Sequence, residues 1–214
     1  MPLTGVEIYL RDFEGIYAFP SSGGTVVGAN WSIDRFRALR RDIDTSYVAL
    51  LRRVAPQLAE CVMHASRADA RLYLGSTRNF FRTAHGPGWV LLGDAHYKKD
   101  PCTAQGITDA FCDAERLADA IDDGLAGRRP LPEALAAYAR RSVAWALPFY
   151  ELTCQMATFA PPPPDMRALY TALQGNQEAI DRFIGLITEA TSPADFFAPE
   201  HVQRLLARPK AQTP

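Results

Sequence analysis

The sequence lacks the features that mark several large classes of protein. Its formal net charge is −1 over 214 residues, so the overall charge gives no indication of nucleic-acid binding. It contains no run of about eighteen apolar residues, which a membrane-spanning helix would need. Its start, MPLTGVEIYLRDFEG, has no basic stretch followed by an apolar one, as a secretory signal would. We therefore expect a cytoplasmic protein that spans no membrane and binds no nucleic acid.

Cysteine is also scarce, and its spacing is uninformative. Four cysteines are scattered along the chain without the close pairs of a metal site. Because no secretory signal is visible, we expect reduced thiols and no metal. The remaining composition, 48% hydrophobic and 22% charged, is typical of a soluble globular chain that can bury a core.

The first thirty residues favour strands. TGVEIYL, GIYAFP and GTVVGANW are short, rich in β-branched and aromatic residues, and separated by turn-forming residues. The stretch PSSGG (20–24) predicts a hairpin turn. Three strands with no helix before them form an unfinished sheet, which needs partners to bury a face.

Helical patterns dominate the rest of the chain. From about Asp34 to His64 apolar residues recur three or four apart, and Pro56 should break or restart the helix. ADARLYLG (68–75) resembles a further strand. A long helix is expected after residue 131, with a kink at Pro148, followed by shorter helices.

The most informative segment runs from Gly88 to Ile121. The apolar run Trp89–Leu92 favours a strand buried on both faces of a parallel sheet. About eleven residues then connect it to a helix, where about two to six are usual. The helix is amphipathic, and its apolar stripe is expected to face the core. That stripe contains Ile107, Ala110, Phe111, Ala114, Leu117, Ala118, Ile121 and Leu125.

The two ends of this connection suggest a binding site. A strand that ends at Gly93 would deliver Asp94 to a sheet edge, where its carboxylate can accept hydrogen bonds from ribityl or ribose hydroxyls. Gln105, Gly106 and Ile107 should form the first helical turn, whose unpaired N–H groups favour negative charge. Reduced flavin, with a polyol chain and an anionic ring, would suit both ends.

These residues resemble the second FAD motif of flavoprotein monooxygenases of the para-hydroxybenzoate hydroxylase type. The matching positions are Gly93-Asp94, Pro101, Gln105-Gly106, Asp109-Ala110 and Asp113-Ala114. The resemblance implies that Asp94 contacts the ribityl chain, that the backbone of Gln105 to Ile107 faces the pyrimidine side of the isoalloxazine, and that Pro101 borders the ring. Ala104 departs from the glycine that is common in the family, which puts close backbone approach there in doubt.

The resemblance also implies a fold and an activity. The expected class is α/β (α+β), a partial FAD/NAD(P)-binding fold with an amino-terminal antiparallel sheet fragment and a helical carboxyl-terminal region. The expected divisions are a partial substrate-domain sheet with a helix (1–75), the FAD-binding strand, loop and helix (76–127), and the helical region (128–214). FAD would be the cofactor and NAD(P)H the co-substrate for O2-dependent hydroxylation of a small organic substrate.

One family element is missing from the sequence. No Gly-x-Gly-x-x-Gly stretch follows a strand, so the chain is expected to correspond to the carboxyl-terminal half of such an enzyme. A separate amino-terminal FAD-binding half would then be its partner.

Several alternatives stay open. The chain could be a reductase or halogenase of the same fold, or a cofactor-free remnant or partner subunit that does not catalyse alone. Asp94 could simply cap a turn. His96 could line the flavin edge or be a solvated loop histidine, and Lys98 and Lys99 are expected to be a solvated pair.

Overall fold

The chain forms two compact units in this computed structural model, which describes residues 3–68, 72, 75 and 78–207. The sheet unit consists of residues 1–76 with 158–161, and the helical unit consists of residues 77–157 with 162–214. Both units contain helices, and every described strand pair is antiparallel.

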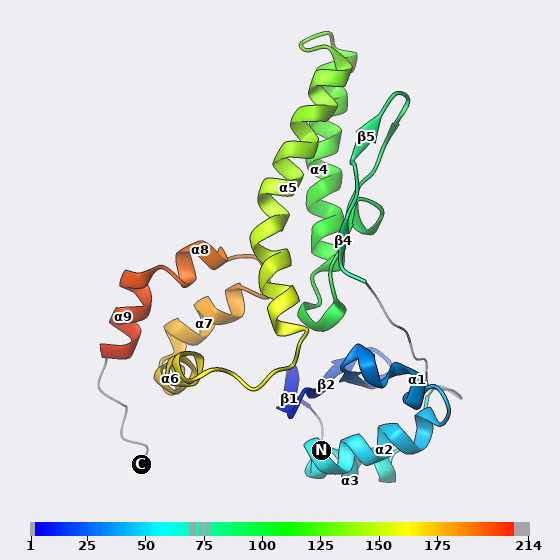
Figure 1. The fold of residues 1–214 in the computed structure, drawn as a ribbon, viewed down its shortest axis with the longest axis vertical. Coiled ribbons are helices and arrows are strands. Elements are labelled where there is room, and N and C mark those ends of the chain that lie inside the picture. The colour runs from blue at the N-terminus through cyan, green and yellow to red at the C-terminus, as the bar shows by residue number, and fades with distance from the viewer. Residues whose placement is uncertain (1–2, 69–71, 73–74, 76–77, 208–214) are drawn as a thin grey trace. The chain divides into compact units, whose positions relative to one another are not determined.

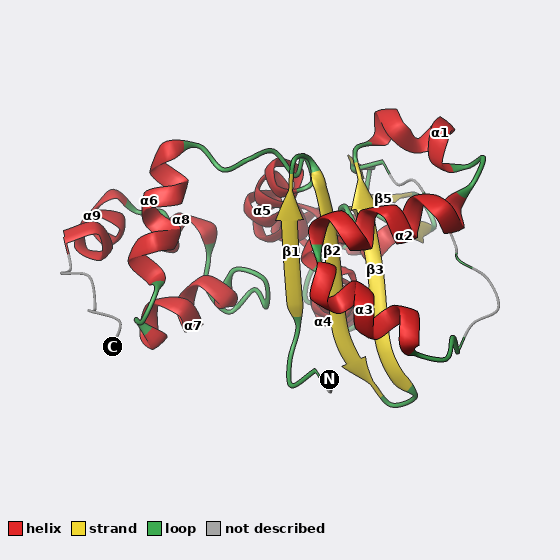
Figure 2. Ribbon diagram, turned by 90° about the horizontal axis from the view of Figure 1, so that it is seen from below, coloured by secondary structure: helices red, strands yellow, loops and turns green. Residues whose placement is uncertain are grey.

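The sheet unit is built on three strands in the order β1-β2-β3 (Figure 2). They are β1 (Glu7–Arg11), β2 (Glu14–Ser21) and β3 (Gly24–Trp31). Ser21 pairs with Gly24, so a two-residue loop joins β2 to β3, as the hairpin signal predicted. The three predicted strands are confirmed.

Helices cover one face of this sheet (Figure 2). The segments after β3 are η1 (Ile33–Arg35), α1 (Phe36–Leu39), α2 (Ile43–Val54) and α3 (Pro56–His64). The Asp42 side chain accepts a hydrogen bond from the Thr45 amide at 3.1 Å and so caps α2. Pro56 is the first residue of α3, which confirms the predicted break. The buried core comprises Ile16, Ala18, Leu50, Leu51, Ala55, Leu58 and Ala59.

The edge strand β1 and the residue before it expose apolar side chains. Val6, Ile8 and Leu10 alternate along the chain and are 68%, 58% and 61% exposed. Such exposure agrees with the open sheet expected from the sequence. The further strand expected at 68–75 lies largely outside the described residues.

The helical unit is organised around two long helices that lie side by side (Figure 1). They are α4 (Gly106–Leu125) and α5 (Leu131–Met156), and α5 continues through Pro148. The predicted start of α4 is confirmed. The core beside this pair comprises Ala84, Leu117, Ala120, Ala134, Leu135 and Tyr138.

Four shorter helices complete the helical unit. They are α6 (Pro164–Leu173), α7 (Gln177–Gly185), α8 (Pro193–Phe196) and α9 (Pro199–Ala207). Their own core comprises Leu169, Leu173, Ala179, Leu186, Phe196 and Leu205. Among residues 3–68, 72, 75 and 78–207, no helix is both long and apolar enough to cross a bilayer.

The predicted buried parallel strand at Trp89–Leu92 is wrong. Only Trp89–Val90 (β6) is a strand, and it pairs antiparallel with His85–Gly86 (β5). Trp89 is 46% exposed and Leu92 is 37% exposed. A short apolar run indicates a buried strand only where neighbouring strands and helices cover it, and the described part of the chain supplies no parallel neighbour.

Candidate functional site

The long connection before α4 is a folded segment. It contains two short 3-10 helices, η2 (Gly93–Ala95) and η3 (Pro101–Thr103), and a strand, β7 (Tyr97–Lys98). β7 pairs with β4 (Phe80–Phe81). Gly93 and Asp94 therefore lie in a 3-10 turn, and the predicted position at the edge of a parallel sheet is wrong.

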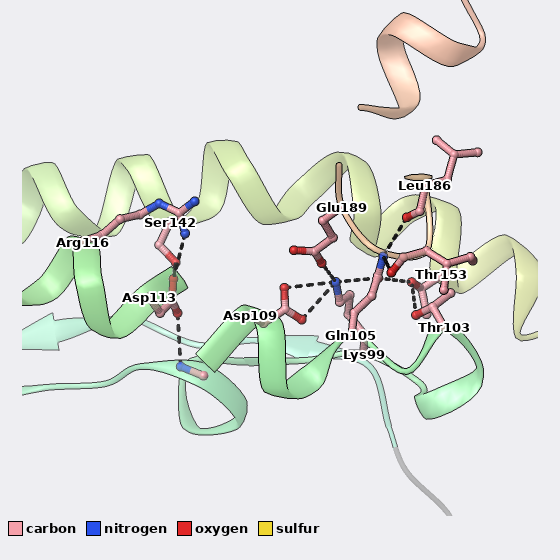
Figure 3. Close-up of polar contacts among 12 residues, drawn as sticks. Lys99, Thr103, Gln105, Asp109, Asp113, Arg116, Ser142, Thr153, Leu186 and Glu189 are labelled. Atoms are coloured by element: carbon pink, nitrogen blue, oxygen red, sulfur yellow. Dashed lines mark hydrogen bonds and ion pairs between the residues drawn. The ribbon is translucent and has the colours of Figure 1, made fainter. Parts of the chain in front are cut away.

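A buried aspartate holds the first of these turns. Asp113 on α4 is fully buried and accepts hydrogen bonds from the Gly93 amide at 3.1 Å and from the Ser142 hydroxyl at 2.7 Å (Figure 3). The His96 ring nitrogen Nδ1 lies 3.8 Å from the same carboxylate. Burial acts to raise the pKa of Asp113, but hydrogen bonds from His96, Ser142 and Gly93 outweigh it and lower the pKa below its ordinary 3.8. Asp113 is therefore an ionised anchor between α4, α5 and the turn.

Gly93 is required by packing. Its φ is +53°, in the left-handed region, and a Cβ there would lie 3.1 Å from the Cβ of Ala110. The residue is buried, so it lets the turn approach α4 and presents little surface to a ligand.

A second buried cluster holds the end of the connection. We call Lys99, Gln105, Asp109 and Glu189 the Lys99 cluster (Figure 3). The Lys99 ammonium donates to Gln105 Oε1 at 2.8 Å and to Glu189 Oε1 at 3.2 Å, and it lies 3.0 Å from Asp109 Oδ2. Its side chain is 3% exposed, so the expected solvated pair is wrong for Lys99. The sequence around Lys99 does not reveal this burial, because its partner Glu189 lies 90 residues away.

Gln105 turns its side chain inward. Its amide nitrogen donates to the carbonyl oxygens of Leu186 at 2.9 Å and Ile187 at 3.3 Å, and its amide oxygen accepts from Lys99. Its side chain therefore ties the start of α4 to the turn after α7. Only its backbone remains for the role that the family resemblance implies.

The other predicted site residues lie on the exposed side of the helix start. Asp94 Oδ1 lies 3.6 Å from the position that a Cβ would take on Gly106, so the carboxylate and the helix start are brought together. Lys98 Nζ lies 3.5 Å from Asp94. The first amides of α4 have no intrahelical acceptor and form the positive end of the helix dipole. The exposed residues are Asp94, Pro101, Ala104, Gly106 and Ile107.

Ala104 adopts a conformation that favours glycine. Its φ of +56° places it in the left-handed region, directly before the N-cap of α4. The family's glycine at this position therefore has a physical reason in this chain, and the alanine carries some backbone strain.

His96 is buried, and the interpretation as a solvated loop histidine is wrong. It is 1% exposed, and its ring lies against those of Phe81, Tyr97 and Tyr138. Its Nδ1 lies 3.2 Å from the Ser142 hydroxyl. His96 therefore belongs to the Asp113 anchor.

The predicted burial of the α4 stripe is confirmed for Leu117 but wrong for most of the stripe. Ile107, Phe111 and Leu125 are 75%, 73% and 77% exposed, whereas Asp109 and Asp113 are buried. Periodicity identifies an apolar stripe but not what covers it, and the buried carboxylates have Lys99 and hydrogen-bond donors as partners. The outer face of α4, as we define it, comprises Ile107, Phe111, Ala114, Ala118, Ile121 and Leu125, all of which are exposed.

Sequence reasoning missed the residues that hold the site. Asp109 and Asp113 were visible only as parts of the motif, although their spacing of four already places both on one side of a helix. Glu189 carries no local signal, because its role depends on a contact with a distant lysine.

Metal and thiol chemistry receive no support from the described residues. No group of three His, Cys, Asp or Glu side chains in that part of the chain is placed to hold a metal ion. Cys61, Cys102, Cys112 and Cys154, all within the described residues, form no disulfide. Burial, with the Asp100 carboxylate second, raises the pKa of the Cys102 thiol to about 12, so Cys102 is not a reactive thiolate.

Comparison with known proteins identifies the fold. No family model matches the chain, and no curated protein matches its sequence. Among solved structures, the chain resembles PqsL, a probable FAD-dependent monooxygenase from Pseudomonas aeruginosa, with 21% identity over 86% of this chain and 47% of PqsL and a TM-score of 0.52. A structure of PqsL in complex with 2-aminobenzoylacetate gives 23% identity over 86% and 46% of the two chains and the same TM-score.

A flavin-dependent brominase, Bmp2, is also similar in structure. It shares 18% identity with this chain over 95% of this chain and 50% of Bmp2, with a TM-score of 0.60. The chain thus spans about half the length of the solved structures that it matches. At these identities the likeness shows the fold alone, and that fold is part of the one found in flavin-dependent monooxygenases and a flavin-dependent halogenase.

Proposed function

We propose that this chain is part of an FAD-dependent oxidoreductase, a flavoprotein monooxygenase of the para-hydroxybenzoate hydroxylase type, and that it corresponds to the carboxyl-terminal portion. The observation that carries the proposal is the position of Asp94 beside Gly106, at the exposed start of α4. The fold likeness to flavin-dependent enzymes supports it.

The residues at this position suit a flavin. The exposed Asp94 carboxylate can accept hydrogen bonds from ribityl hydroxyls. The amides of Gly106 and Ile107 lie at the positive end of α4, where they would stabilise negative charge on the pyrimidine side of the ring. Pro101 and Ala104 are exposed beside them and would border the ring.

The flavin would supply the redox chemistry when bound, and this chain would supply position and electrostatics. We propose NAD(P)H as the reductant and O2-dependent hydroxylation of a small organic molecule as the reaction.

We further propose that a separate FAD-binding half covers the outer face of α4. Ile107 and Phe111 are exposed apolar residues at the same end of α4 as the proposed flavin contacts, so a partner that packs there would also border the flavin. About half of the length of each matched solved structure lies outside the part that this chain covers. The acidic residues Glu115, Asp119 and Asp122 are also exposed on α4, so the partner should carry basic residues near its apolar face.

Flavin affinity in the assembled complex tests the function. A separate FAD-binding half with a Gly-x-Gly-x-x-Gly stretch would first be sought in the DNA around the gene. The chain would be co-expressed with it, and FAD binding would be measured by equilibrium dialysis. Asp94→Ala should weaken binding about tenfold or more, because it removes charge-assisted hydrogen bonds. Glu151→Gln, at an exposed carboxylate of α5, is the control and should bind like wild type. Equal affinities for wild type and Asp94→Ala would contradict the proposal.

The same preparation tests the partner. Phe111→Asp should abolish co-purification, because it places a charge at the centre of an apolar contact. Glu151→Gln, at an exposed residue of α5, should leave it intact. Survival of the complex in Phe111→Asp would contradict the proposed docking surface.

A halogenase is the second candidate, and the similarity to Bmp2 favours it. Product analysis with and without bromide would separate the two: a brominated product indicates halogenation, and an oxygenated product formed without bromide indicates monooxygenation.

A further inference from the structure

The Lys99 cluster buries two carboxyl groups and one ammonium group. Lys99 is its only cation, and the carboxylates of Asp109 and Glu189 both bind the ammonium. All three side chains are at most 5% exposed. With both carboxylates ionised, the cluster would keep one uncompensated negative charge away from water, which is costly.

Glu189 is the member whose surroundings least suit an ionised carboxylate. Its Oε1 accepts from Lys99, but its Oε2 is buried without a hydrogen-bond partner among the described residues. The Lys99 ammonium lies closer to Asp109, at 3.0 Å, than to Glu189, at 3.2 Å. Tyr97 on β7 and Cys112 on α4 also interact electrostatically with Glu189, and neither supplies a positive charge. Burial first, and the Asp109 carboxylate second, raise the pKa of Glu189.

The backbone at Glu189 is held in an unusual conformation. Its φ is +61°, a left-handed value that is unfavourable for a residue with a side chain. In this conformation its side chain accepts the hydrogen bond from Lys99 at 3.2 Å. The same turn begins with Leu186 and Ile187, whose carbonyl oxygens accept from the Gln105 side chain.

We infer that Glu189 is a positioning residue for the exposed start of α4: in its proton-carrying form it binds Lys99 and so holds Gln105, and with it the first turn of the helix, in place. Loss of the proton adds a buried negative charge, which loosens the turn and the helix start together. As part of a flavin site, this role rests on the function proposed above.

The role makes the helix start sensitive to pH in a defined direction. A carboxyl whose pKa is higher in the folded than in the unfolded chain contributes stability below the unfolded pKa, and this is lost as the pH rises through the folded pKa. The ordinary value for Glu189 is 4.5, so the loss begins above about pH 4.5 and is complete above the raised value.

Carbon-13 NMR of the Glu189 carboxyl measures the proton directly, and amide hydrogen exchange of residues 109–111 measures the helix start. The carboxyl should titrate above 4.5, and exchange, corrected for its intrinsic pH dependence, should accelerate in wild type as the pH rises. Glu189→Ala should exchange about tenfold faster or more at all pH values, since it removes the bond to Lys99. Glu189→Gln should restore protection and abolish the acceleration, because its amide oxygen still accepts from Lys99 and carries no charge.

Glu151→Gln serves as the control, since it removes an exposed glutamate of α5 and should behave as wild type throughout. A titration midpoint of the Glu189 carboxyl at or below 4.5 would overturn the inference. So would amide exchange in Glu189→Gln that depends on pH as it does in wild type. None of these measurements needs flavin. If they come out as expected while the chain fails to bind flavin, the positioning of the helix start by Glu189 stands and the proposed function fails.

Discussion

Both faces of α4 depart from the pattern of an ordinary amphipathic helix. The inner face buries the carboxylates of Asp109 and Asp113 along with Leu117 and Ala120, whereas the outer face exposes Ile107, Phe111 and Leu125. The inner carboxylates are tolerable because an ammonium, a hydroxyl and a backbone amide bind them. The apolar residues of the outer face are exposed, and no described residue of the helical unit covers them. The inner face of α4 is thus held by polar contacts as well as by its buried apolar residues, and we propose that a partner covers its outer face.

The largest effect is expected at the inner face. Asp113→Ala leaves the Gly93 amide and Ser142 without their buried acceptor and Arg116 and His96 without a nearby negative charge. We expect a loss of about 3–5 kcal/mol in the free energy of unfolding, measured with urea. Asp119→Ala, at an exposed position of the same helix, should change it by less than about 0.5 kcal/mol. Similar losses for the two variants would mean that the buried anchor does not hold the unit.

The pH dependence of this effect has the opposite sign to that of Glu189. Because the folded pKa of Asp113 is lowered, its contribution is present above the ordinary 3.8 and disappears as the pH falls through the folded value. The difference between wild type and Asp113→Ala should therefore shrink in acid. A constant difference down to about pH 2 would indicate that ionisation of Asp113 is irrelevant.

The next effect concerns the two adjacent lysines. Lys99→Met removes the buried ammonium and leaves two carboxylates facing each other, so we expect a loss of about 3 kcal/mol near neutral pH. Lys98→Met removes a lysine that is 35% exposed and should cost less than about 1 kcal/mol. Thermal or urea unfolding of the two variants makes the comparison. Equal costs would show that the Lys99 cluster contributes no more than an ordinary surface pair.

A smaller effect of opposite sign is expected at Ala104. Ala104→Gly relieves the left-handed strain at φ +56° but gives the unfolded chain more freedom, so a net gain of at most about 1 kcal/mol is expected. A clear loss of stability in urea would show that the alanine side chain makes a contact worth more than the strain.

The smallest effect is expected at the outer face. Phe111→Ser removes a side chain that is 73% exposed, and the isolated chain should lose less than about 0.5 kcal/mol. Leu117→Ala, on the same helix but buried at 6% exposure, should cost about 2–5 kcal/mol. A large cost for Phe111→Ser in the isolated chain would mean that its outer face is already covered.

The sequence predicted the positions of helices and strands better than it predicted which of their faces are buried. Local signals located the three strands, the break at Pro56 and the start of α4, because turns, prolines and helix starts depend on neighbours in the chain. The same local rules failed for Trp89–Leu92 and for the orientation of α4, since burial depends on what covers a face.

The candidate site divides in the same way. Asp94 lies beside the start of α4, and a local motif could point to both because they belong to one short connection in the sequence. It could not reveal that Gln105 and Lys99 turn inward, since their partners on the turn after α7 lie more than 80 residues away. Buried partners of this kind have no local pattern that a reader of the sequence could detect.

Amide mapping by NMR can test whether Asp94 and the start of α4 face a flavin, as we propose. A nitrogen-15-labelled chain would be titrated with FMN, which carries the isoalloxazine and the ribityl chain, and with AMP, which carries neither. We expect FMN to cause saturable chemical-shift changes at the amides of Asp94 and of residues 106–108, and AMP to cause none. An FMN concentration of about 1 mM is enough to detect even weak binding. No saturable shift with FMN, or equal shifts with FMN and AMP at these amides, would contradict this proposal.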